Sequence, residues 1–371
     1  MRPILLLGPG NSTHTLEWRR ILSEVSGTCV LASLHPCDPH DVAGGDVVRL
    51  PTGLLPFPLA PRPLVRTVRQ LIRTRDIGII IAYYLTSYGL LASWAVPGRY
   101  VAAAAGSDLF PVRLKAVRRW AAARAVRAAA GGAAWTGIMS RRMVELGMPP
   151  ERIHVAPRGI DLTLFRPRAV RAAAEPLRVI STRRLRPLFR HHILIDALAR
   201  LASRNEPLEA VLIGDGSERD RLEQLIAARG LQGTVRLPGP RPRSELAGNL
   251  ARADVFVSLS RSDGLSASLL EAMACGLLPI VSDIPSNRTV VSHEENGLLV
   301  AGDDPAELAA ALRRAGRDEN LRARARARNL AVARRSFDIR RNTSALLDRI
   351  GRWSGRGPAA GSTGEARGSS S

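Results

Sequence analysis

Ser262-Asp-Gly-Leu-Ser-Ala-Ser-Leu-Leu-Glu271-Ala-Met-Ala-Cys-Gly276 is the stretch that decides the fold, because it places two carboxylates eight residues apart around a turn of small residues. The apolar residues after the turn predict a helix, with Asp263 before the turn and Glu271 two helical turns inside. A helix N-terminus offers unpaired backbone N–H groups and a positive dipole end, which attract phosphate. The geometry suits a nucleotide sugar, with one carboxylate toward the sugar and the other toward the ribose diol. A buried strand-to-helix junction without a ligand is the alternative.

Length and hydrophobic pattern predict an α/β protein of two domains. The 371 residues exceed what one hydrophobic core usually holds. Short apolar runs alternate with amphipathic stretches, which indicates βα units and mainly parallel sheets. The expected strands are Ile4 to Leu7, Thr28 to Ala32, Ile77 to Ala82, Tyr100 to Ala104, Arg152 to Val155, Leu177 to Ser181, Ala210 to Ile213, Val235 to Leu237, Val255 to Ser258 and Leu278 to Ser282.

A domain junction is expected near Phe165-Arg-Pro167, because one complete sheet pattern precedes it and another begins at Leu177. Residues 1–166 would form the first domain and residues 167–335 the second. Residues 336–355 predict a C-terminal helix that packs back toward the first domain. Residues 356–371 are rich in Gly, Ser and Pro and are expected to be a disordered tail.

The net charge of +21 is carried almost wholly by arginine, since Lys115 is the single lysine. Such an excess favours an acidic partner, namely substrate phosphates, an anionic membrane face or nucleic acid. Aromatic residues make up only 4% of the chain, and no zinc-binding, RNA-recognition or helix-turn-helix pattern occurs. Nucleic acid is therefore not expected as a partner.

Cysteine usage and the lack of a leader pattern favour a cytoplasmic location. Cys29, Cys37 and Cys275 are an odd set without metal-ligand spacing, so no disulfide framework is expected. The apolar run at residues 4–7 is too short for a signal peptide. Residues 77–98 carry no charge and are long enough to span a bilayer, but polar residues, Gly and Pro interrupt them. We expect strand, loop and helix there, with a membrane span as the alternative.

Four motifs follow one another along the chain. They are Pro157-Arg-Gly-Ile-Asp161 with Phe165 and Pro167, Gly214-Asp-Gly216, Leu270-Glu-Ala-Met-Ala-Cys-Gly276 and Asn296-Gly-Leu-Leu299. In order and spacing they resemble the motifs of the retaining glycosyltransferases of family 4, and the resemblance covers most of residues 1–350. It implies the GT-B fold, in which two Rossmann-like domains have parallel sheets that face each other across a cleft. The first domain would lie on the acceptor side and the second would bind the nucleotide sugar.

The resemblance implies a role for each carboxylate of the opening stretch. Glu271 would hold the ribose of the nucleotide. Asp263, where the family more often has glutamate, would contact the donor sugar with one methylene less of reach. The turn formed by Gly264, Leu265 and Ser266 would give backbone N–H groups to the diphosphate.

Cations for the donor phosphates are expected in Ser181-Thr-Arg-Arg184-Leu-Arg-Pro-Leu-Phe-Arg190. Arg184 matches the family's phosphate-binding arginine, and Arg190 or Arg186 would replace the lysine that the family commonly has. A solvated arginine-rich loop is the alternative. Gly214 and Gly216 would border the donor.

The first glycine loop resembles the family's turn that leads to a histidine and a tryptophan on the first helix. Gly8, Gly10 and His14 would line the acceptor side, although His14 is equally well explained as a helix-start residue without a chemical role. Thr13 stands where a dinucleotide-binding fingerprint has its third glycine, so a nicotinamide enzyme is a weaker alternative.

Ala105 departs from the family, in which many members carry a histidine that contacts the donor sugar. Asp108 remains as a polar catalytic candidate at the same strand end, or as a cap of the following helix. The substitution leaves room for a weakly active protein.

The expected chemistry is sugar transfer from a UDP- or GDP-sugar to a glycan or lipid-linked acceptor, as in cell-surface polysaccharide assembly. No Asp-x-Asp pair is present to hold a metal. Arginines and a helix N-terminus can stabilise the departing phosphate, which fits the metal-independent, configuration-retaining chemistry that the resemblance implies. No cofactor or metal is expected besides the nucleotide-sugar substrate. A nucleotide-sugar epimerase of GT-B fold and a catalytically silent scaffold or partner subunit are the alternatives.

Two basic stretches lie in the first domain. Arg62, Arg66, Arg69 and Arg73 recur at helical spacing beside an apolar stripe. Residues 113–127 add Lys115, Arg118, Arg119 and Arg124 with Trp120 and no acid. Ordinary surface helices with solvated arginines explain both stretches, and a first domain that rests on an anionic membrane is the alternative.

Overall fold

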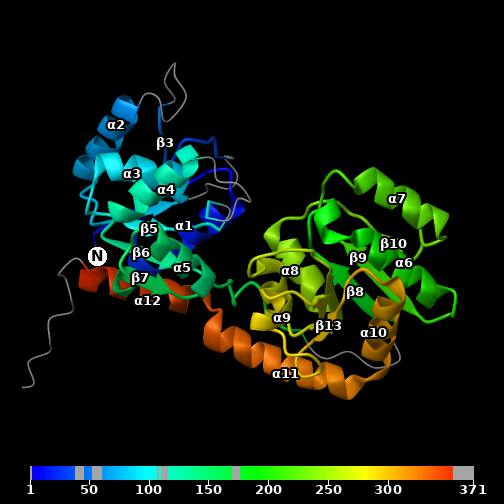
Figure 1. The fold of residues 1–371 in the computed structure, drawn as a ribbon. Helices are drawn as coiled ribbons and strands as arrows, with labels where there is room; N and C mark the ends of the chain where they lie inside the picture. The colour runs from blue at the N-terminus through cyan, green and yellow to red at the C-terminus, as the bar shows by residue number, and fades with distance from the viewer. Residues whose placement is uncertain are drawn as a thin grey trace, which may run out of the picture. The chain divides into compact units, whose positions relative to one another are not determined.

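The computed structural model describes residues 2–37, 46–51, 61–106, 108–109, 116–168 and 176–353 (Figure 1). The chain divides into two compact units, each with its own sheet. The first comprises Met1–Pro157 with Arg340–Ser371, and the second comprises Arg158–Ile339.

The first unit is built on a seven-stranded parallel sheet with the order β3-β2-β1-β4-β5-β6-β7. Its strands are β1 (Ile4–Leu7), β2 (Cys29–Ser33), β3 (Val47–Arg49), β4 (Ile79–Tyr83), β5 (Val101–Ala103), β6 (Gly131–Ala134) and β7 (Ile153–Val155). Its helices are α1 (Thr13–Ser26), α2 (Pro61–Thr74), the π-helix η2 (Leu85–Gly89), α3 (Leu90–Ala95), α4 (Ala116–Arg127), α5 (Gly137–Glu145), the short η3 (Pro150–Arg152) and α12 (Ile339–Trp353).

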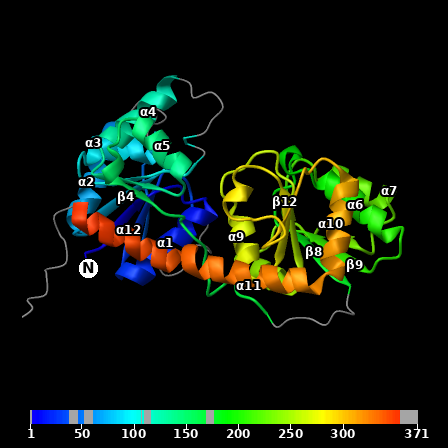
Figure 2. The ribbon, with the colours of Figure 1, turned by 60° about the horizontal axis from the view of Figure 1, so that its bottom comes forward.

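The sequence of the central strand β1 is a continuous apolar run. All four residues are buried, because helices cover both faces of a parallel sheet. Leu5 and Leu7 point into the core beneath α2 to α5, whereas Ile4 and Leu6 point into the core beneath α1 and α12. In that second core, Leu346 of α12 belongs to the same cluster as Trp18 of α1, and Figure 2 shows the two helices on the same side of the sheet.

The second unit is built on a six-stranded parallel sheet with the order β10-β9-β8-β11-β12-β13. Its strands are β8 (Leu177–Ser181), β9 (Leu208–Leu212), β10 (Val235–Arg236), β11 (Val255–Ser258), β12 (Leu278–Ser282) and β13 (Leu298–Val300). Its helices are η4 (Pro187–Phe189), α6 (His191–Ala202), α7 (Arg219–Ala228), α8 (Arg243–Arg252), α9 (Ala267–Ala274), η5 (Asn287–Thr289), α10 (Pro305–Arg317) and α11 (Glu319–Ser336).

The two parallel α/β sheets confirm the predicted fold class. Every predicted strand is present, with ends that move by at most two residues, but β3, β6 and β13 were not predicted. Residues 77–98 form β4, η2 and α3, as expected. No helix in the described part of the chain is both long and apolar enough to cross a bilayer.

The division between the units falls after Pro157 rather than after residue 166. Ile160 and Phe165 are buried in a core of the second unit. The backbone of Ile160 also pairs with the segment that leaves this unit, since its N–H donates to Phe337 O (2.8 Å) and its carbonyl accepts from Ile339 N (3.1 Å). Residues 340–353 belong to the first unit with α12, and the tail expected at residues 356–371 lies outside the described residues.

The motif around Asn296 is structural. Asn296 donates to Asn329 Oδ1 (2.9 Å), and Asn329 in turn donates to Leu277 O (2.9 Å). Both asparagines are buried, so each amide gains the partner that burial requires. The pair ties the β13 region to α11.

We predict that Gly159→Ala destabilises the second unit by about 3 kcal/mol. Gly159 has φ +87°, and an added Cβ would lie 2.7 Å from Phe337 O. The control is Gly230→Ala, which has φ +67° and open space around the added Cβ, and should cost only about 1 kcal/mol. Urea unfolding measures both free energies, and equal losses would show that the close backbone approach at Gly159 does not matter.

Candidate active site

The candidate site lies at the carboxyl edge of the second sheet, where the loops after β8 and β11 meet the start of α9. Ser266 is the N-cap of α9, and its side chain accepts from Leu269 N (3.4 Å). Ser268 Oγ donates to Thr182 O (3.2 Å), which joins the first turn of α9 to the loop after β8. Gly264 is exposed, and a Cβ added there would meet open space, so the turn before α9 is accessible.

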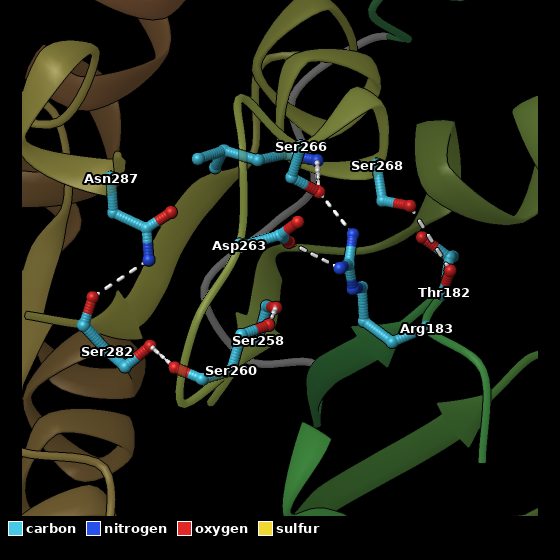
Figure 3. A network of polar contacts seen from close by, with 10 residues as sticks. Thr182, Arg183, Ser258, Ser260, Asp263, Ser266, Ser268, Ser282 and Asn287 are labelled. Atoms are coloured by element: carbon cyan, nitrogen blue, oxygen red, sulfur yellow. Dashed lines mark hydrogen bonds and ion pairs between the residues drawn. The ribbon is translucent and has the colours of Figure 1, made fainter. Parts of the chain in front are cut away.

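Arg183 holds this junction together (Figure 3). Its guanidinium donates to Ser266 Oγ and forms an ion pair with Asp263. The Arg183 Cζ atom lies 4.3 Å from the centre of the Phe189 ring, so the cation also stacks on an aromatic face. Burial raises the pKa of the Asp263 carboxyl above its ordinary value, and the Arg183 charge opposes that rise.

The loop after β8 places the two adjacent arginines differently, and the assignment of Arg184 to the donor phosphates stays a prediction. The Arg184 side chain is exposed, whereas its neighbour Arg183 is the one that reaches Asp263. Both arginines lie in the loop beyond β8, and the Arg183 guanidinium is the one that reaches the start of α9. Arg183 was not singled out from the sequence, and two adjacent arginines gave no signal to choose between them.

The two candidates for the second cation lie in different environments. Arg186 is exposed. Arg190 is buried in a left-handed backbone conformation (φ +50°) and donates from Nε to Leu259 O (2.7 Å). Its guanidinium also lies against Gly302, because a Cβ on that glycine would be 2.8 Å from Arg190 Nη2. The structure thus gives Arg190 a role in bracing the loops after β11 and β13.

Gly214 and Gly216 support the loop that carries Arg183. A Cβ on Gly214 would lie 2.5 Å from Arg183 O, and one on Gly216 would lie 2.3 Å from Leu185 O. Leu185 N also donates to Asp215 O (3.0 Å), so the two loops run in close backbone contact. The glycines are therefore required by packing, whether or not they border a donor.

Glu271 is held by an arginine that the sequence did not indicate. Its side chain is only 5% exposed, and Oε1 accepts from Arg243 Nη2 at 3.2 Å. Arg243 begins α8, and its Cζ lies 5.1 Å from the centre of the Phe165 ring. The motif residues Phe165 and Glu271 are thus joined through Arg243. It is 28 residues from Glu271 in sequence, so no local pattern links the two.

Several polar atoms near Arg183 lack partners. Thr182 Oγ1, Arg183 Nε and His191 Nδ1 are buried without a hydrogen-bond partner within the described ranges. Burial, aided by the charges of Arg183 and His192, lowers the pKa of His191 to about 4, so its ring is neutral near pH 7. These atoms leave hydrogen-bonding capacity beside the loop after β8 that the described side chains do not use.

Buried serines continue the polar edge beyond Asp263 (Figure 3). Ser258 and Ser260 have their hydroxyls 3.4 Å apart, and Ser282 Oγ donates to Ser260 O at 2.6 Å. Asn287 Nδ2 donates to Ser282 O at 2.8 Å. These bonds fix the ends of β11 and β12 behind the candidate site.

The glycine loop of the first unit is tightly packed. A Cβ on Gly8 would lie 2.9 Å from Thr15 Cγ2, and one on Gly10 would lie 2.0 Å from Cys37 Sγ. Gly10 N donates to Ser33 Oγ at 2.7 Å. His14 is exposed on the first turn of α1.

The Asp108 carboxylate holds two loops of the first unit, and the residues of a helix that it was expected to cap, 110–115, lie outside the described residues. Asp108 Oδ2 accepts from Leu85 N (2.7 Å), and Oδ1 accepts from Ala105 N (3.0 Å). Leu85 follows Tyr84, a non-glycine residue at φ +76°, so Asp108 stabilises a strained turn. Burial raises the pKa of Asp108, and these backbone donors oppose the rise.

No group of three or more His, Cys, Asp or Glu side chains suited to a metal ion occurs among the residues that the structure describes. Arginine guanidinium groups, rather than acidic clusters, are the prominent charges of the candidate site.

Comparison with known proteins gives the family. The model of "Glycosyltransferase Family 4" matches residues 10–164, and that of "Glycosyl transferases group 1" matches residues 166–330. The chain belongs to glycosyltransferase family 4. Solved structures agree with the GT-B fold of this family. HepE of Anabaena, crystallised with UDP, superposes with a TM-score of 0.77 and 21% identity over 95% of this chain and 100% of HepE.

Two relatives show the range of names within the family. WcaL of Escherichia coli, named as a colanic acid biosynthesis glycosyltransferase, is 35% identical over 182 residues, or 47% of this chain and 44% of WcaL. The D-inositol 3-phosphate glycosyltransferase of Thermobispora bispora is 32% identical over 190 residues, or 47% of this chain and 44% of that protein. The matched region thus spans less than half the length of these curated relatives.

We predict that Arg183→Gln lowers the free energy of unfolding by about 3 kcal/mol, because it leaves the largely buried Asp263 carboxylate without its cation. The matched control is Arg184→Gln, which removes an exposed arginine next to it and should change stability by about 0.5 kcal/mol or less. Urea unfolding followed by circular dichroism compares the two variants. An equal or larger loss for Arg184→Gln would show that the ion pair between Arg183 and Asp263 does not stabilise this loop.

Proposed function

We propose that this protein transfers a sugar from a UDP- or GDP-sugar to a glycan or lipid-linked acceptor. The observation that carries the proposal is the pair of carboxylates around the start of α9, each held by an arginine from another segment. Asp263 is paired with Arg183 at the open turn, and Glu271 is paired with Arg243 in the interior. One carboxylate is thus set for the sugar and the other for the nucleotide.

Glu271 is the group we assign to the ribose. A carboxylate accepts two hydrogen bonds from a diol, and burial strengthens them by excluding water. Arg243 orients the carboxylate before the nucleotide binds. The complex of HepE with UDP, a protein that shares the fold, supports a nucleotide as the ligand.

The departing diphosphate would be stabilised by Arg183 and the N-terminus of α9. Two guanidinium nitrogens of Arg183 are engaged by Ser266 and Asp263, while Nε has no partner within the described ranges. Fixed donors of this kind stabilise developing negative charge without a metal ion. We therefore propose a metal-independent transfer with retention of configuration, in which the acceptor hydroxyl attacks on the face that the diphosphate leaves.

The names of relatives and the cysteines bear on the acceptor and the compartment. The name of WcaL favours a growing polysaccharide, and that of the Thermobispora bispora relative favours a small phosphorylated polyol. Gly8, Gly10 and His14 are our candidates for the acceptor side. Cys29, Cys37 and Cys275 are not joined in disulfides, which fits a reducing cytoplasm.

Sugar release or transfer from a panel of UDP- and GDP-sugars should persist in EDTA, because the proposed charge stabilisation comes from arginine and backbone groups. Chromatography of the products, with and without oligosaccharide acceptors, measures this. Activity that requires a divalent metal would contradict the proposed mechanism. Epimerised donor without any acceptor would identify an epimerase, and the absence of turnover with every donor would favour the silent scaffold.

We expect Glu271→Gln to raise the dissociation constant of the bound nucleotide by about 10- to 100-fold, the size of one or two lost charged hydrogen bonds. Calorimetry with UDP and GDP measures the change, and thermal unfolding verifies that the variant is folded. Glu223→Gln, which removes an exposed carboxylate on α7, is the control and should leave the affinity unchanged. Equal affinity for wild type and Glu271→Gln would remove the ribose assignment.

A further inference from the structure

One helical layer of the first unit carries only positively charged side chains. Figures 1 and 2 show α2, α3 and α4 side by side, and all three pack on the same hydrophobic core. No Asp or Glu occurs in α2, in α4, or in α3 and the four residues that follow it, to residue 99. The exposed arginines are Arg62, Arg66, Arg69, Arg73, Arg99, Arg118, Arg119, Arg124 and Arg127. Repulsion among these cations opposes folding, so the layer fits a polyanionic partner.

The layer also contains an apolar groove. A cavity of about 700 Å³ lies between α2 and the end of α3, with Val65, Ile72 and Trp94 among its lining residues and arginines beside them. Arg69 donates to Ala95 O (2.9 Å) and Trp94 O (3.1 Å), which fixes one wall of the groove. A hydrocarbon floor with guanidinium groups around it matches an amphiphile with an anionic head.

The first turns of α4 expose apolar side chains among the arginines. Val117 is 66% exposed and Trp120 is 52% exposed, and they are three residues apart on one face of the helix. Arg118 and Arg119 lie between them in sequence. Tryptophan next to arginine is typical of surfaces that enter the boundary between lipid headgroups and acyl chains. Residues 113–115, which were part of the basic stretch in the sequence, lie outside the described residues.

We propose that the layer formed by α2, α3 and α4 docks on the surface of an anionic lipid bilayer. Arginines of α2 would contact lipid phosphates, and Trp120 would enter the headgroup boundary. Nucleic acid shares the phosphates but offers no partner for the apolar groove or for Val117, so the bilayer explains more of the observations. The proposal concerns a surface of the first unit and is independent of any donor bound by the second.

The test is sedimentation of the full chain with vesicles. Binding to equal parts of phosphatidylcholine and phosphatidylglycerol should greatly exceed binding to phosphatidylcholine alone, and salt should weaken it. The triple variant Arg62→Glu, Arg66→Glu and Arg73→Glu should bind the anionic vesicles at least about 100-fold more weakly, since each arginine contributes about fivefold. Trp120→Ser should weaken binding without changing its salt dependence.

The matched control reverses three exposed arginines of the second unit, Arg200→Glu, Arg204→Glu and Arg252→Glu, which changes the net charge equally. This control should retain most of the vesicle binding. If the two triple variants lose binding equally, the effect is one of net charge and the proposed face is wrong. Equal binding of the wild type to neutral and anionic vesicles, or no binding to either, also overturns the proposal. Tighter binding to single-stranded DNA than to anionic vesicles would assign the layer to nucleic acid instead.

Discussion

The ion pair between Arg183 and Asp263 is the contact on which the rest of the candidate site depends. Strands β8 and β11 are neighbours in the sheet, so their carboxyl ends meet at one edge, but strand pairing fixes nothing beyond those ends. Arg183 supplies the missing restraint because it binds Asp263, which lies 80 positions later in the chain. Phe189 covers its guanidinium and limits the water that would otherwise weaken the pair.

The second carboxylate, that of Glu271, is also held by an arginine from another segment of the chain. Glu271 lies inside α9, where burial would favour the neutral acid, and Arg243 offsets that cost with a charge and a hydrogen bond. Phe165 in turn limits where Arg243 can lie. Both acids are thus oriented by protein groups before any ligand arrives, which is the condition for precise recognition of a charged substrate.

Much of the fold was predictable because buried parallel strands consist of consecutive apolar residues, as in β1. Strand β6 was not, since glycine and alanine have no strand preference. Neighbouring side chains leave room only for small residues there, because a Cβ on Gly132 would meet the side chains of Met143 and Met148. In the site, the motif placed Asp263 and Glu271 at the start of α9 and inside it. That Arg183 pairs with Asp263, and Arg243 with Glu271, depends on three-dimensional contacts that no spacing encodes.

The return of α12 to the first unit has a consequence for how the chain matures during translation. Leu346, Leu347 and Ile350 complete one of the two cores flanking the first sheet, yet they are synthesised after the whole second unit. A ribosome therefore releases the leading sheet with one face only partly covered, by α1, until the last helix emerges. Chaperones that shield exposed apolar surface would have their longest engagement with the earliest part of this polypeptide.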